Sequence, residues 1–589
     1  MKDFLKYTLA TITGIILVTI LFFILMIGSL SVMVASGSKP VSVNENSVLV
    51  LKAGMQIPDR GDQNPLSGLD PLSMTLSPAT GLNDILKNIE KAASDPKIKG
   101  ILIENGILAP GWGTTEEIRN ALLKFRESGK FVIAWADYVM LQEGYYLSTA
   151  AEKIYINPGT MMDFKGLSGE IMFYKKALDN VGVDVQVIRH GRFKGAVEPF
   201  LLDDLSPENE EQIKDYVGSI WQHVIANISL ARNIGETELN TMADNLVAYV
   251  AQGALDNGLV DGLLYRDQLE DTLKVLSGVE SSRKLSLVSM SKYSRVPESV
   301  KKASGKGRIA VIFAEGNIVT GKGGSYNIGG NHYAEVIRKE RLDSNVKAIV
   351  LRVNSPGGNA IASDVIWREL ELAAAEKPLV ISMGNYAASG GYFIAAPATR
   401  IYSNPTTITG SIGVFGLIPN ASTLLNQKLG INTATVKTNA SSDFPSVIRS
   451  LSSKEKEVMQ MSIEHVYSDF VSKVASGRNM SPQAVDSIGE GRVYSGTRGL
   501  QIGLVDEIGG LTEAIKGAAE LADLESYTVR ELPVPVDPYT QLLSQLTGEI
   551  KMKILQKEFG TTARIIKELT EIQSLTGIQA RLPYFIDIR

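Results

Sequence analysis

One serine in the second half of the chain lies among residues small enough to let a carbonyl group approach its hydroxyl. Ser389 follows Ala387 and Ala388 and precedes Gly390 and Gly391. Glycines at these positions let the chain turn from a strand into a helix whose first N–H groups face that carbonyl. The pattern predicts a nucleophilic serine, and close packing of small residues against a helix is the structural alternative.

The first half of the chain supplies a lysine that lies between apolar and small residues. Lys194 belongs to the run Phe-Lys-Gly-Ala-Val-Glu-Pro-Phe over residues 193–200. A free lysine has a pKa of about 10.4, but removal from water can lower it to about 7–8, where the amine can act as a base. A serine hydroxyl needs such a base to attack a carbonyl. We therefore predict that Ser389 is a nucleophile and Lys194 its general base, with a solvated surface cation as the alternative for the lysine.

Histidine and cysteine offer little competition for these roles. None of the four histidines lies in the glycine-rich loops, and His223 and His465 lie in segments with helical patterns. His190, four residues before Lys194, is the one alternative base. The chain has no cysteine, which excludes a thiol nucleophile, disulfides, thiolate metal sites and a lipid-modified cysteine.

Two further glycine-rich loops are expected beside the serine. Asn-Ser-Pro-Gly-Gly over 354–358 follows an expected strand, and its open N–H groups could hold a developing oxyanion. A tight strand-to-helix turn is the alternative for this loop. In Thr-Gly-Ser-Ile-Gly over 409–413, Ser411 could hydrogen bond to a lysine amine or could cap a turn.

Composition excludes other classes of function. The net charge of −5 gives no general basic surface for nucleic acid. The chain has neither a clustered His/Glu ligand set nor a phosphate-loop lysine motif. We therefore expect no metal, no cofactor and no nucleic-acid partner.

The chain contains an internal duplication. Glu-Lys-Ile-Tyr-Ile-Asn-Pro over 152–158 matches Thr-Arg-Ile-Tyr-Ser-Asn-Pro over 399–405, 247 positions later. At this offset Ser389 corresponds to Gln142, and Lys194 corresponds to Ser441. Each half therefore carries the chemical group that the other half lacks.

Each half alternates short apolar runs with helical patterns, which predicts an α/β fold of repeated βαβ units around parallel sheets. Ligand sites in such sheets gather at the carboxyl ends of strands. The expected strands cover residues 48–51, 100–103, 131–135, 153–156, 309–313, 348–353 and 379–383, and the expected helices cover 115–125 and 362–375.

The N-terminus predicts a membrane anchor. The run from Ile12 to Leu30 is almost wholly apolar, and about 20 apolar residues span a bilayer as a helix. A cleaved signal peptide is the alternative, although its apolar region usually has only about 7–15 residues. Lys2 and Lys6 favour an N-terminus in the cytoplasm, and we then expect the rest of the chain on the far side of the membrane.

The expected organisation therefore has two homologous domains behind an anchor. The boundaries are a cytoplasmic N-terminus over 1–7, an anchor over 8–35, a linker over 36–46, a first domain over 47–275, a linker over 276–305, a second domain over 306–525 and a helical tail over 526–589.

The combination of Phe-Lys-Gly-Ala-Val-Glu-Pro-Phe, Asn-Ser-Pro-Gly-Gly, Ala-Ala-Ser-Gly-Gly-Tyr and Thr-Gly-Ser-Ile-Gly resembles the signal peptide peptidase A (protease IV) family in its long tandem-domain form. The resemblance covers nearly the whole chain. It implies a fold like the Clp protease and crotonase group, with the lysine from the first domain and the serine from the second. It further implies that Ser411 holds the lysine amine and that Gly358 and Gly390 offer oxyanion donors.

The same resemblance implies a bowl-shaped homotetramer on the outer face of the bacterial inner membrane. Its expected substrates are signal peptides already cut from their precursors, cleaved further at apolar segments. Two other functions stay open: an acyl-thioester enzyme of the crotonase type, and a non-catalytic membrane scaffold. The anchor and the complementary serine and lysine favour the protease.

Overall fold

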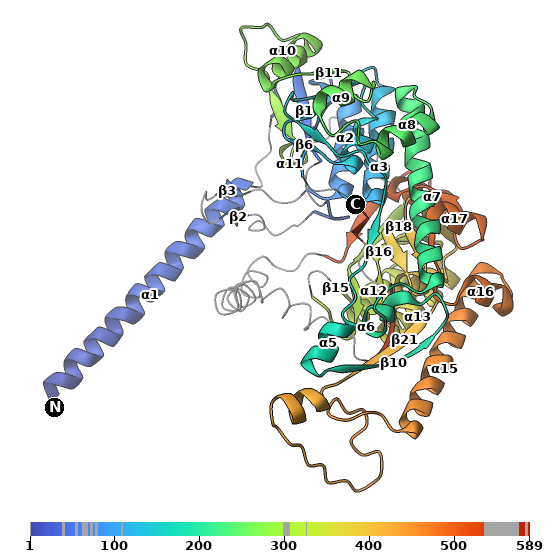
Figure 1. The fold of residues 1–589 in the computed structure, drawn as a ribbon. Coiled ribbons are helices and arrows are strands. Elements are labelled where there is room, and N and C mark those ends of the chain that lie inside the picture. The colour runs from blue at the N-terminus through green and yellow to red at the C-terminus, as the bar shows by residue number, and fades with distance from the viewer. Residues whose placement is uncertain are drawn as a thin grey trace.

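The computed structural model describes residues 2–37, 42–53, 57–61, 69–70, 75–76, 80–107, 110–297, 307–324, 327–534, 577–582 and 587–588. Helix α1 (Lys2–Gly37) projects away from a body made of two α/β halves (Figure 1). In the part of the chain that the structure describes, no helix has the length and hydropathy that crossing a membrane requires. The anchor expected over residues 8–35 is therefore not confirmed and stays a prediction.

The first half is built on a six-stranded sheet in which all neighbouring strands are parallel. Its order is β11 (Gly262–Leu263), β7 (Lys153–Ile156), β5 (Phe131–Ala136), β4 (Ile98–Asn105), β1 (Ser47–Lys52) and β12 (Leu287–Ser289). The central strands are continuous runs of buried apolar residues, as expected for a parallel sheet covered on both faces. The expected α/β fold is confirmed here.

Helices cover this sheet and connect its strands. Helix α2 (Leu82–Ser94) buries Leu82, Ile85 and Ile89, which the helical repeat places on one face. The other helices are α3 (Trp112–Arg126), α4 (Gln142–Ser148), α5 (Lys175–Val181), α6 (Glu198–Leu201), α7 (Pro207–Arg232), α8 (Glu236–Asp244), α9 (Ala251–Asp256), α10 (Arg266–Ser277) and α11 (Met290–Tyr293), with a 3-10 turn over Gly195–Val197. Short strands are β2 (Leu69–Asp70), β3 (Thr75–Leu76), β6 (Val139–Met140), β8 (Met161–Met162) and β9 (Gly169–Glu170).

The second half repeats this architecture. Its main sheet has the order β22 (Val493–Ser495), β20 (Ile408–Gly410), β18 (Leu379–Ala388), β16 (Val346–Ser355), β13 (Gly307–Glu315) and β24 (Tyr527–Leu532). Strand β19 (Arg400–Ser403) also pairs with β18, and β23 (Glu507–Ile508) pairs with β19. Its helices are α12 (Gly330–Leu342), α13 (Ala360–Glu376), α14 (Gly390–Ala395), α15 (Ser453–Arg478), α16 (Pro482–Ile488), α17 (Gly496–Gln501) and α18 (Leu511–Leu521), with a π-helical turn over Leu424–Lys428.

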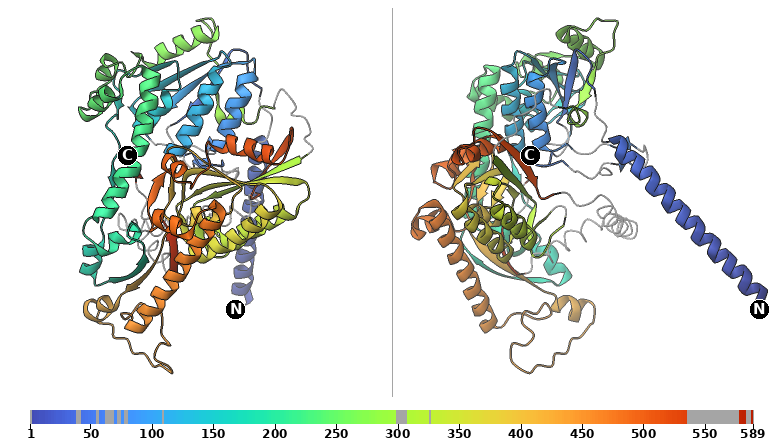
Figure 2. Two further views of the ribbon diagram at one scale, coloured as in Figure 1. Left: turned by 90° about the vertical axis from the view of Figure 1, so that its right-hand side faces the viewer. Right: turned by 180° about the vertical axis from the view of Figure 1, so that it is seen from behind.

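A third sheet joins the two halves. Its order is β10 (Asp184–His190), β21 (Val414–Asn420), β25 (Gly577–Arg581), β17 (Gly357–Asn359), β14 (Asn317–Val319) and β15 (Asn327–Gly329). Strand β10 belongs to the first half of the sequence, yet it pairs with β21 of the second half, and its neighbours α5 and α6 lie there too (Figure 1). Helix α7 then runs along one side of both halves (Figure 2). The segment from α5 to α7 is thus the connection through which the first half reaches the second.

Two segments expected to be a linker and a helical tail contain strands in the structure. Within the linker expected over 276–305, β12 pairs with β1, because its apolar Val288 is buried against the first sheet. The tail expected to be helical over 526–589 begins with β24, which extends the second sheet beside β13. The other elements described in that tail are β25 and β26 (Asp587–Ile588), also strands. The helical stretch expected over 541–575 lies outside the described residues.

Candidate active site

Lys194 and Ser389 meet inside the protein. The lysine Nζ lies 2.8 Å from the serine Oγ, and both side chains are fully buried. The same Nζ lies 3.0 Å from Oγ and 3.2 Å from the carbonyl oxygen of Ser411. The amine is therefore held by a hydroxyl and a carbonyl on one side, with the predicted nucleophile as its remaining partner.

The pairing of β10 with β21 explains how residues from two halves come together. The strands are antiparallel over seven residue pairs, from Asp184–Asn420 to His190–Val414. The end of β10 is thus opposite the start of β21. Lys194 follows the end of β10, and Ser411 precedes the start of β21, so the register brings the lysine segment beside the serine loop.

Several backbone contacts hold the lysine segment in place. Gln212 Nε2 donates to the carbonyl of Phe193 at 2.9 Å, and Gln212 Oε1 accepts from the Val493 N–H at 3.0 Å. At Gly491, a Cβ would lie 2.7 Å from Lys194 Cα, so a larger residue would push the lysine away. Gln212 was not predicted, because it lies on α7, far from the motifs, and only the tertiary contact reveals its role.

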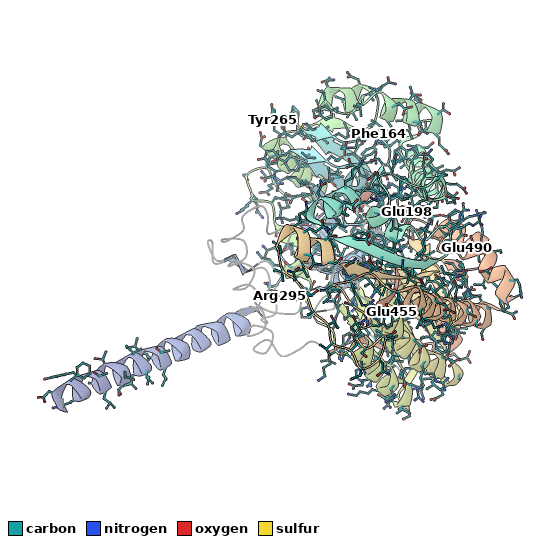
Figure 3. The ribbon with its side chains drawn as sticks, turned by 60° about the horizontal axis from the view of Figure 1, so that its bottom comes forward. Phe164, Glu198, Tyr265, Arg295, Glu455 and Glu490 are labelled. Atoms are coloured by element: carbon teal, nitrogen blue, oxygen red, sulfur yellow. The ribbon has the colours of Figure 1, made fainter. Side chains whose placement is uncertain are left out.

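A buried carboxylate stabilises the turn that follows the lysine. Glu198 accepts from the Ser206 hydroxyl at 2.6 Å and from Asn209 Nδ2 at 3.0 Å. The backbone carbonyl of Glu490 accepts from the N–H of Phe193, the residue before the lysine, at 3.0 Å (both glutamates are labelled in Figure 3). Glu198 belongs to the apolar run around Lys194, and a charged residue in such a run is the signal that could have identified it.

Burial favours the neutral form of the Lys194 amine. Removal from water lowers the pKa of Lys194 well below its usual range, and no carboxylate near the amine opposes this shift. The partners of the amine are the hydroxyl and carbonyl groups described above. A neutral amine can accept a proton from a hydroxyl, which a lysine at its ordinary pKa does only at high pH.

The backbone at Ser389 is strained. This residue connects β18 to α14 with φ of 53° and ψ of −116°, a conformation that residues with a side chain rarely adopt. Its N–H donates to the carbonyl of Gly410 at 2.8 Å, and its Oγ lies 3.4 Å from the carbonyl oxygen of Gly413. A serine on a sharp strand-to-helix turn presents its hydroxyl to an approaching carbonyl.

The two glycines expected to donate to an oxyanion lie together beside the serine. A Cβ at Gly390 would lie 3.1 Å from the Gly358 nitrogen. A Cβ at Gly357 would lie 2.7 Å from the Gly390 nitrogen, and the φ of 98° at Gly357 also favours glycine. The loop over 354–358 therefore brings its backbone N–H groups to the start of α14.

In the first half, Gln142 occupies the position that corresponds to Ser389, and its side chain is bonded to the backbone of the following loop. Gln142 Oε1 accepts from the N–H groups of Lys165 and Gly166 at 3.0 and 2.9 Å, and its Nε2 donates to the Gly166 carbonyl at 3.0 Å. Next to it, burial raises the pKa of Glu143 to about 7, and that carboxyl accepts from the Thr115 hydroxyl at 2.5 Å. The first half has the frame of the site without a nucleophile.

Comparison with known proteins identifies the family. A model of peptidase family S49 matches residues 124–280 and 371–525. Protease 4 of Haemophilus influenzae is 33% identical over 584 residues, which cover 95% of this chain and 94% of that protein. The chain belongs to peptidase family S49. It is also 31% identical over 551 residues to the chloroplastic serine protease SPPA of Arabidopsis thaliana, covering 92% of this chain and 78% of that protein, and it is a serine protease.

The two matched segments of the S49 peptidase correspond to the two halves of the duplication. Among solved structures, a ClpP1 mutant from Listeria monocytogenes aligns with 35% of this chain and 94% of its own at 15% identity and a TM-score of 0.23. A score this low supports no argument about the fold. The expected likeness to Clp protease therefore stays a prediction, while two tandem S49 segments in an α/β fold are established.

A buried ion cluster holds the two halves of the S49 peptidase together. Arg352, on the strand that leads to the Gly-Gly loop, lies 2.8 Å from Asp59 and 2.7 Å from Glu117. Both carboxylates come from the first half, and all three side chains are almost completely buried. Glu117 also accepts from the Leu511 N–H at 2.8 Å. This cluster was not predicted, because isolated charged residues in a sequence do not reveal their partners.

The alternative base, His190, has its side-chain partners on α15. The His190 Nδ1 lies 2.6 Å from Glu464 Oε2, and the ring stacks on Tyr467 with centroids 3.6 Å apart. The His190 ring, at the end of β10, thus packs against α15.

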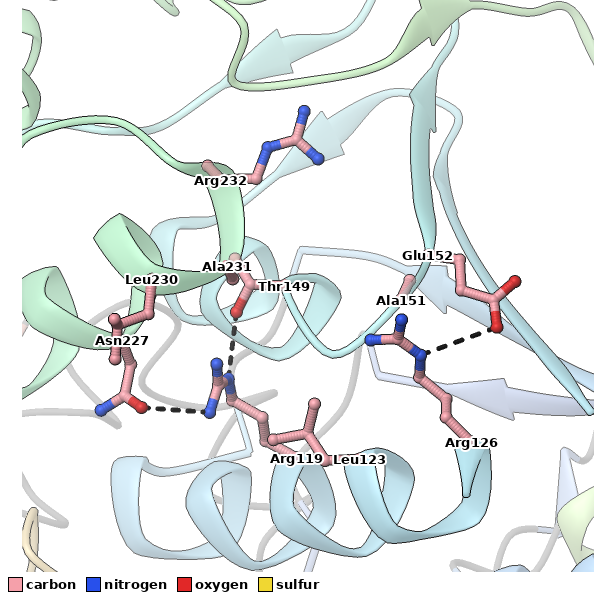
Figure 4. Close-up of a pocket in the computed structure, with 10 residues that line it drawn as sticks. All are labelled: Arg119, Leu123, Arg126, Thr149, Ala151, Glu152, Asn227, Leu230, Ala231 and Arg232. Atoms are coloured by element: carbon pink, nitrogen blue, oxygen red, sulfur yellow. Dashed lines mark hydrogen bonds and ion pairs between the residues drawn. The ribbon is translucent and has the colours of Figure 1, made fainter. Parts of the chain in front are cut away.

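A cavity of about 360 Å³ opens in the first half of the peptidase, lined partly by three arginines (Figure 4). Arg119 donates to Thr149 at 3.0 Å, and Arg126 lies 3.7 Å from Glu152. Arg232 lies 2.9 Å from Asp261. Each arginine already has a polar partner, and the cavity is lined by neither Ser389 nor Lys194.

Proposed function

We propose that the chain is an endopeptidase in which Ser389 is the nucleophile and Lys194 the general base. The observation that carries the proposal is the 2.8 Å separation of Lys194 Nζ and Ser389 Oγ, two side chains that are both fully buried. The lowered pKa of the lysine supports it, because a neutral amine can remove the hydroxyl proton.

The proposed reaction has two stages. Ser389 Oγ attacks the peptide carbonyl while the Lys194 amine takes its proton, and the ammonium then protonates the departing amine. Water, activated by the same lysine, hydrolyses the acyl-enzyme and restores the serine. Ser411 orients the amine through its hydroxyl, 3.0 Å away.

The N–H groups of Gly358 and Gly390 are the proposed oxyanion donors. They approach one another at the start of α14, where the carbonyl oxygen of a substrate would gain charge. Fixed donors in a buried site stabilise that charge without reorganisation, and the loss of one such donor typically costs about 10²–10³ in rate.

The proposed substrates are cleaved signal peptides and other apolar peptides. This part rests on the resemblance to the signal peptide peptidase A family and on membership of family S49. The resemblance also supports a homotetramer, which sedimentation at several protein concentrations would test. A monomer at all concentrations would rule the tetramer out.

We further propose that residues 8–35 anchor the protein in a bacterial inner membrane, with the body on the periplasmic side. The apolar run from Ile12 to Leu30 supports the anchor, as do the exposed apolar side chains of Ile15, Leu17 and Val18 on α1. Membrane fractionation of the full chain and of a chain lacking residues 1–38 tests it. Recovery of the full chain in the soluble fraction would contradict the proposal.

Peptide cleavage by matched variants tests the catalytic assignment. We expect Ser389→Ala and Lys194→Ala each to reduce turnover by at least about 10³-fold, since removing a nucleophile or its base leaves only binding and oxyanion stabilisation. His190→Ala is the control and should retain turnover. Activity in Lys194→Ala together with its loss in His190→Ala would instead transfer the role of base to His190.

A further inference from the structure

The arginine-lined cavity of the first half lies between two helices and the turn that follows α4. Its walls come from the C-terminal turns of α3, the C-terminal turns of α7 and residues 149–152 (Figure 4). A volume of about 360 Å³ is sufficient for a small organic molecule. The lining combines the arginines with apolar side chains, among them Leu123, Ala151 and Leu230. A ligand in this cavity would therefore meet both cations and apolar surface.

Arg232 belongs to the frame that both halves share. Its Nη1 lies 2.9 Å from Asp261, and its Nε and Nη2 donate to the Gly258 carbonyl at 3.1 and 2.8 Å. In the second half, Arg478 pairs with Asp506 in the same way. The guanidinium of Arg232 is thus committed to contacts of the frame, and it forms one wall of the cavity.

The other two arginines are particular to the first half. Arg119 and Arg126 both lie on α3. At the offset of 247 positions they correspond to Ile366 and Ala373 of α13, which are buried in the apolar core of the second half. The duplicated frame therefore folds with apolar side chains at these places, so the frame itself does not require two arginines.

Both of these arginines are held in place and keep unused donors. Arg119 Nε donates to the Thr149 hydroxyl at 3.0 Å and Nη1 to Asn227 at 3.4 Å, which leaves Nη2 without a hydrogen-bond partner among the described residues. Arg126 Nη1 donates to the Ala150 carbonyl at 3.2 Å. Its buried Nε has no hydrogen-bond acceptor in the part of the chain that the structure describes. A buried donor without a partner is uncommon in folded proteins and indicates a missing acceptor.

The charges around the cavity favour an acceptor with a single negative charge. The cavity lies at the C-terminal ends of α3 and α7, where the helix dipole disfavours anions. Glu152 lies 3.7 Å from Arg126 Nε, and Glu116 lies one turn before Arg119 on α3. These groups would repel a doubly charged phosphate. A carboxylate carries one charge and forms paired hydrogen bonds with a guanidinium.

We propose that this cavity binds one carboxylate carried on a small apolar body, with Arg119 and Arg126 as its donors. The ligand carboxylate replaces the partly exposed Glu152 beside Arg126, and Leu123 and Leu230 contact the apolar part. Two sources share this chemistry: the C-terminal residue of a short apolar peptide, and a free aliphatic acid. The proposed peptidase would release such peptides, so the peptide source rests on the proposed function, whereas the carboxylate site does not.

Titration calorimetry with the full-length Ser389→Ala variant tests the site, because this variant should not cleave a bound peptide. We expect acetyl-Ala-Leu with a free carboxylate to bind, and its C-terminal amide to bind at least about 10-fold more weakly, since the amide loses charge-assisted hydrogen bonds. Isocaproate is the probe for a free acid. The tighter binder of acetyl-Ala-Leu and isocaproate identifies the source. Equal binding of the peptide and its amide, or tighter binding of inorganic phosphate than of both carboxylates, would overturn the proposal.

Substitutions in the same background show whether the carboxylate occupies the cavity. Arg126→Ala should weaken the binding of acetyl-Ala-Leu at least about 10-fold, because it removes one charged donor. Glu152→Gln removes the competing carboxylate and should tighten binding several-fold. The matched control is Lys124→Ala, which changes an exposed cation of α3 outside the cavity. Unchanged affinity in Arg126→Ala, weaker binding in Glu152→Gln, or an equal loss in Lys124→Ala would each overturn the site.

Cleavage of an apolar peptide by the wild-type protein separates this proposal from the proposed function. Cleavage by the wild type, with no binding of either carboxylate to Ser389→Ala, would overturn the carboxylate site and leave the peptidase in place. Binding that depends on Arg126, with no cleavage by the wild type, would support the site and remove the peptidase together with the peptide source.

Discussion

Lys194 Nζ and Ser389 Oγ lie 2.8 Å apart, although 195 positions of sequence separate the two residues. The lysine comes from a segment of the first half that crosses to pair with β21, and the serine comes from the end of β18 in the second half. The site is complete only when both halves have folded and docked. The proposed catalysis by this pair therefore depends on the interface between the halves.

The dependence of turnover on pH should report the buried lysine. Below the lowered pKa of Lys194 the amine is protonated and cannot accept the serine proton, so kcat/KM should rise with pH through that value. A measurement of kcat/KM between about pH 5 and pH 10 checks this. A rise that begins only near pH 10, close to the ordinary lysine value of about 10.4, would contradict the effect of burial.

Removal of the lysine amine should stabilise the fold. Because the pKa of Lys194 is lowered on folding, the unfolded chain binds more protons between that lowered value and the ordinary one. In this window the stability of the wild type rises by up to about 1.4 kcal/mol per pH unit. We expect Lys194→Met to melt at a higher temperature near pH 7, with a difference that shrinks toward pH 10. Parallel melting profiles would contradict the prediction.

Ser411 should affect turnover more than substrate binding. Its hydroxyl lies 3.0 Å from the lysine amine, and a hydrogen bond of this kind is worth about 0.5–1.5 kcal/mol. We expect Ser411→Ala to lower kcat by about 10-fold, with KM nearly unchanged. Ser411→Thr keeps a hydroxyl and should recover part of the rate. A change confined to KM would show that Ser411 contacts substrate and does not orient the base.

The buried ion cluster should contribute strongly to the docking of the halves. Arg352→Met leaves the Asp59 and Glu117 carboxylates buried without their cation, and the loss of one partner from such a pair typically costs about 3–5 kcal/mol. Chemical denaturation measures the effect. The control is Arg283→Met, which breaks the exposed pair with Glu280 and should change stability little. Similar effects of the two substitutions would show that burial of the cluster contributes nothing.

Glu143 should reduce stability as pH rises. Burial raises its pKa from 4.5 to about 7, so its contribution is complete below pH 4.5 and is lost as pH increases to about 7. The total loss is about 3 kcal/mol. In Glu143→Gln the glutamine does not titrate and can still accept from Thr115. The stability of the variant relative to the wild type should therefore increase over this pH range. Unfolding measured at pH 4 and pH 8 checks the prediction.

The fold class followed from local patterns. Runs such as Ala348–Leu351 are apolar and bounded by charged residues, and they form the buried parallel strands that these patterns indicate. Strands β12 and β24 were not expected, because their place in a sheet depends on the neighbour with which each pairs. The sequence of either segment alone does not predict pairing between strands that are distant in the chain.

The residue types of the site were also readable from the sequence. Small residues around Ser389, the apolar setting of Lys194 and the duplication that separates them indicated a shared site. The sequence did not predict how close Ser389 and Lys194 lie, nor the supporting roles of Gln212 and Arg352. These depend on side chains from elements far apart in the chain.

The sequence by itself determined which chemical groups were available, a hydroxyl and an amine each placed among small or apolar neighbours, and the repeated α/β frame that carries them. Only the tertiary structure decided that these groups meet, because the antiparallel register of β10 with β21 sets where the lysine lies. It also decided that β25 pairs with β17, the strand of the Gly-Gly loop. The physical reason is that composition and periodicity act over a few residues, whereas burial and strand register are set by contacts between residues hundreds of positions apart.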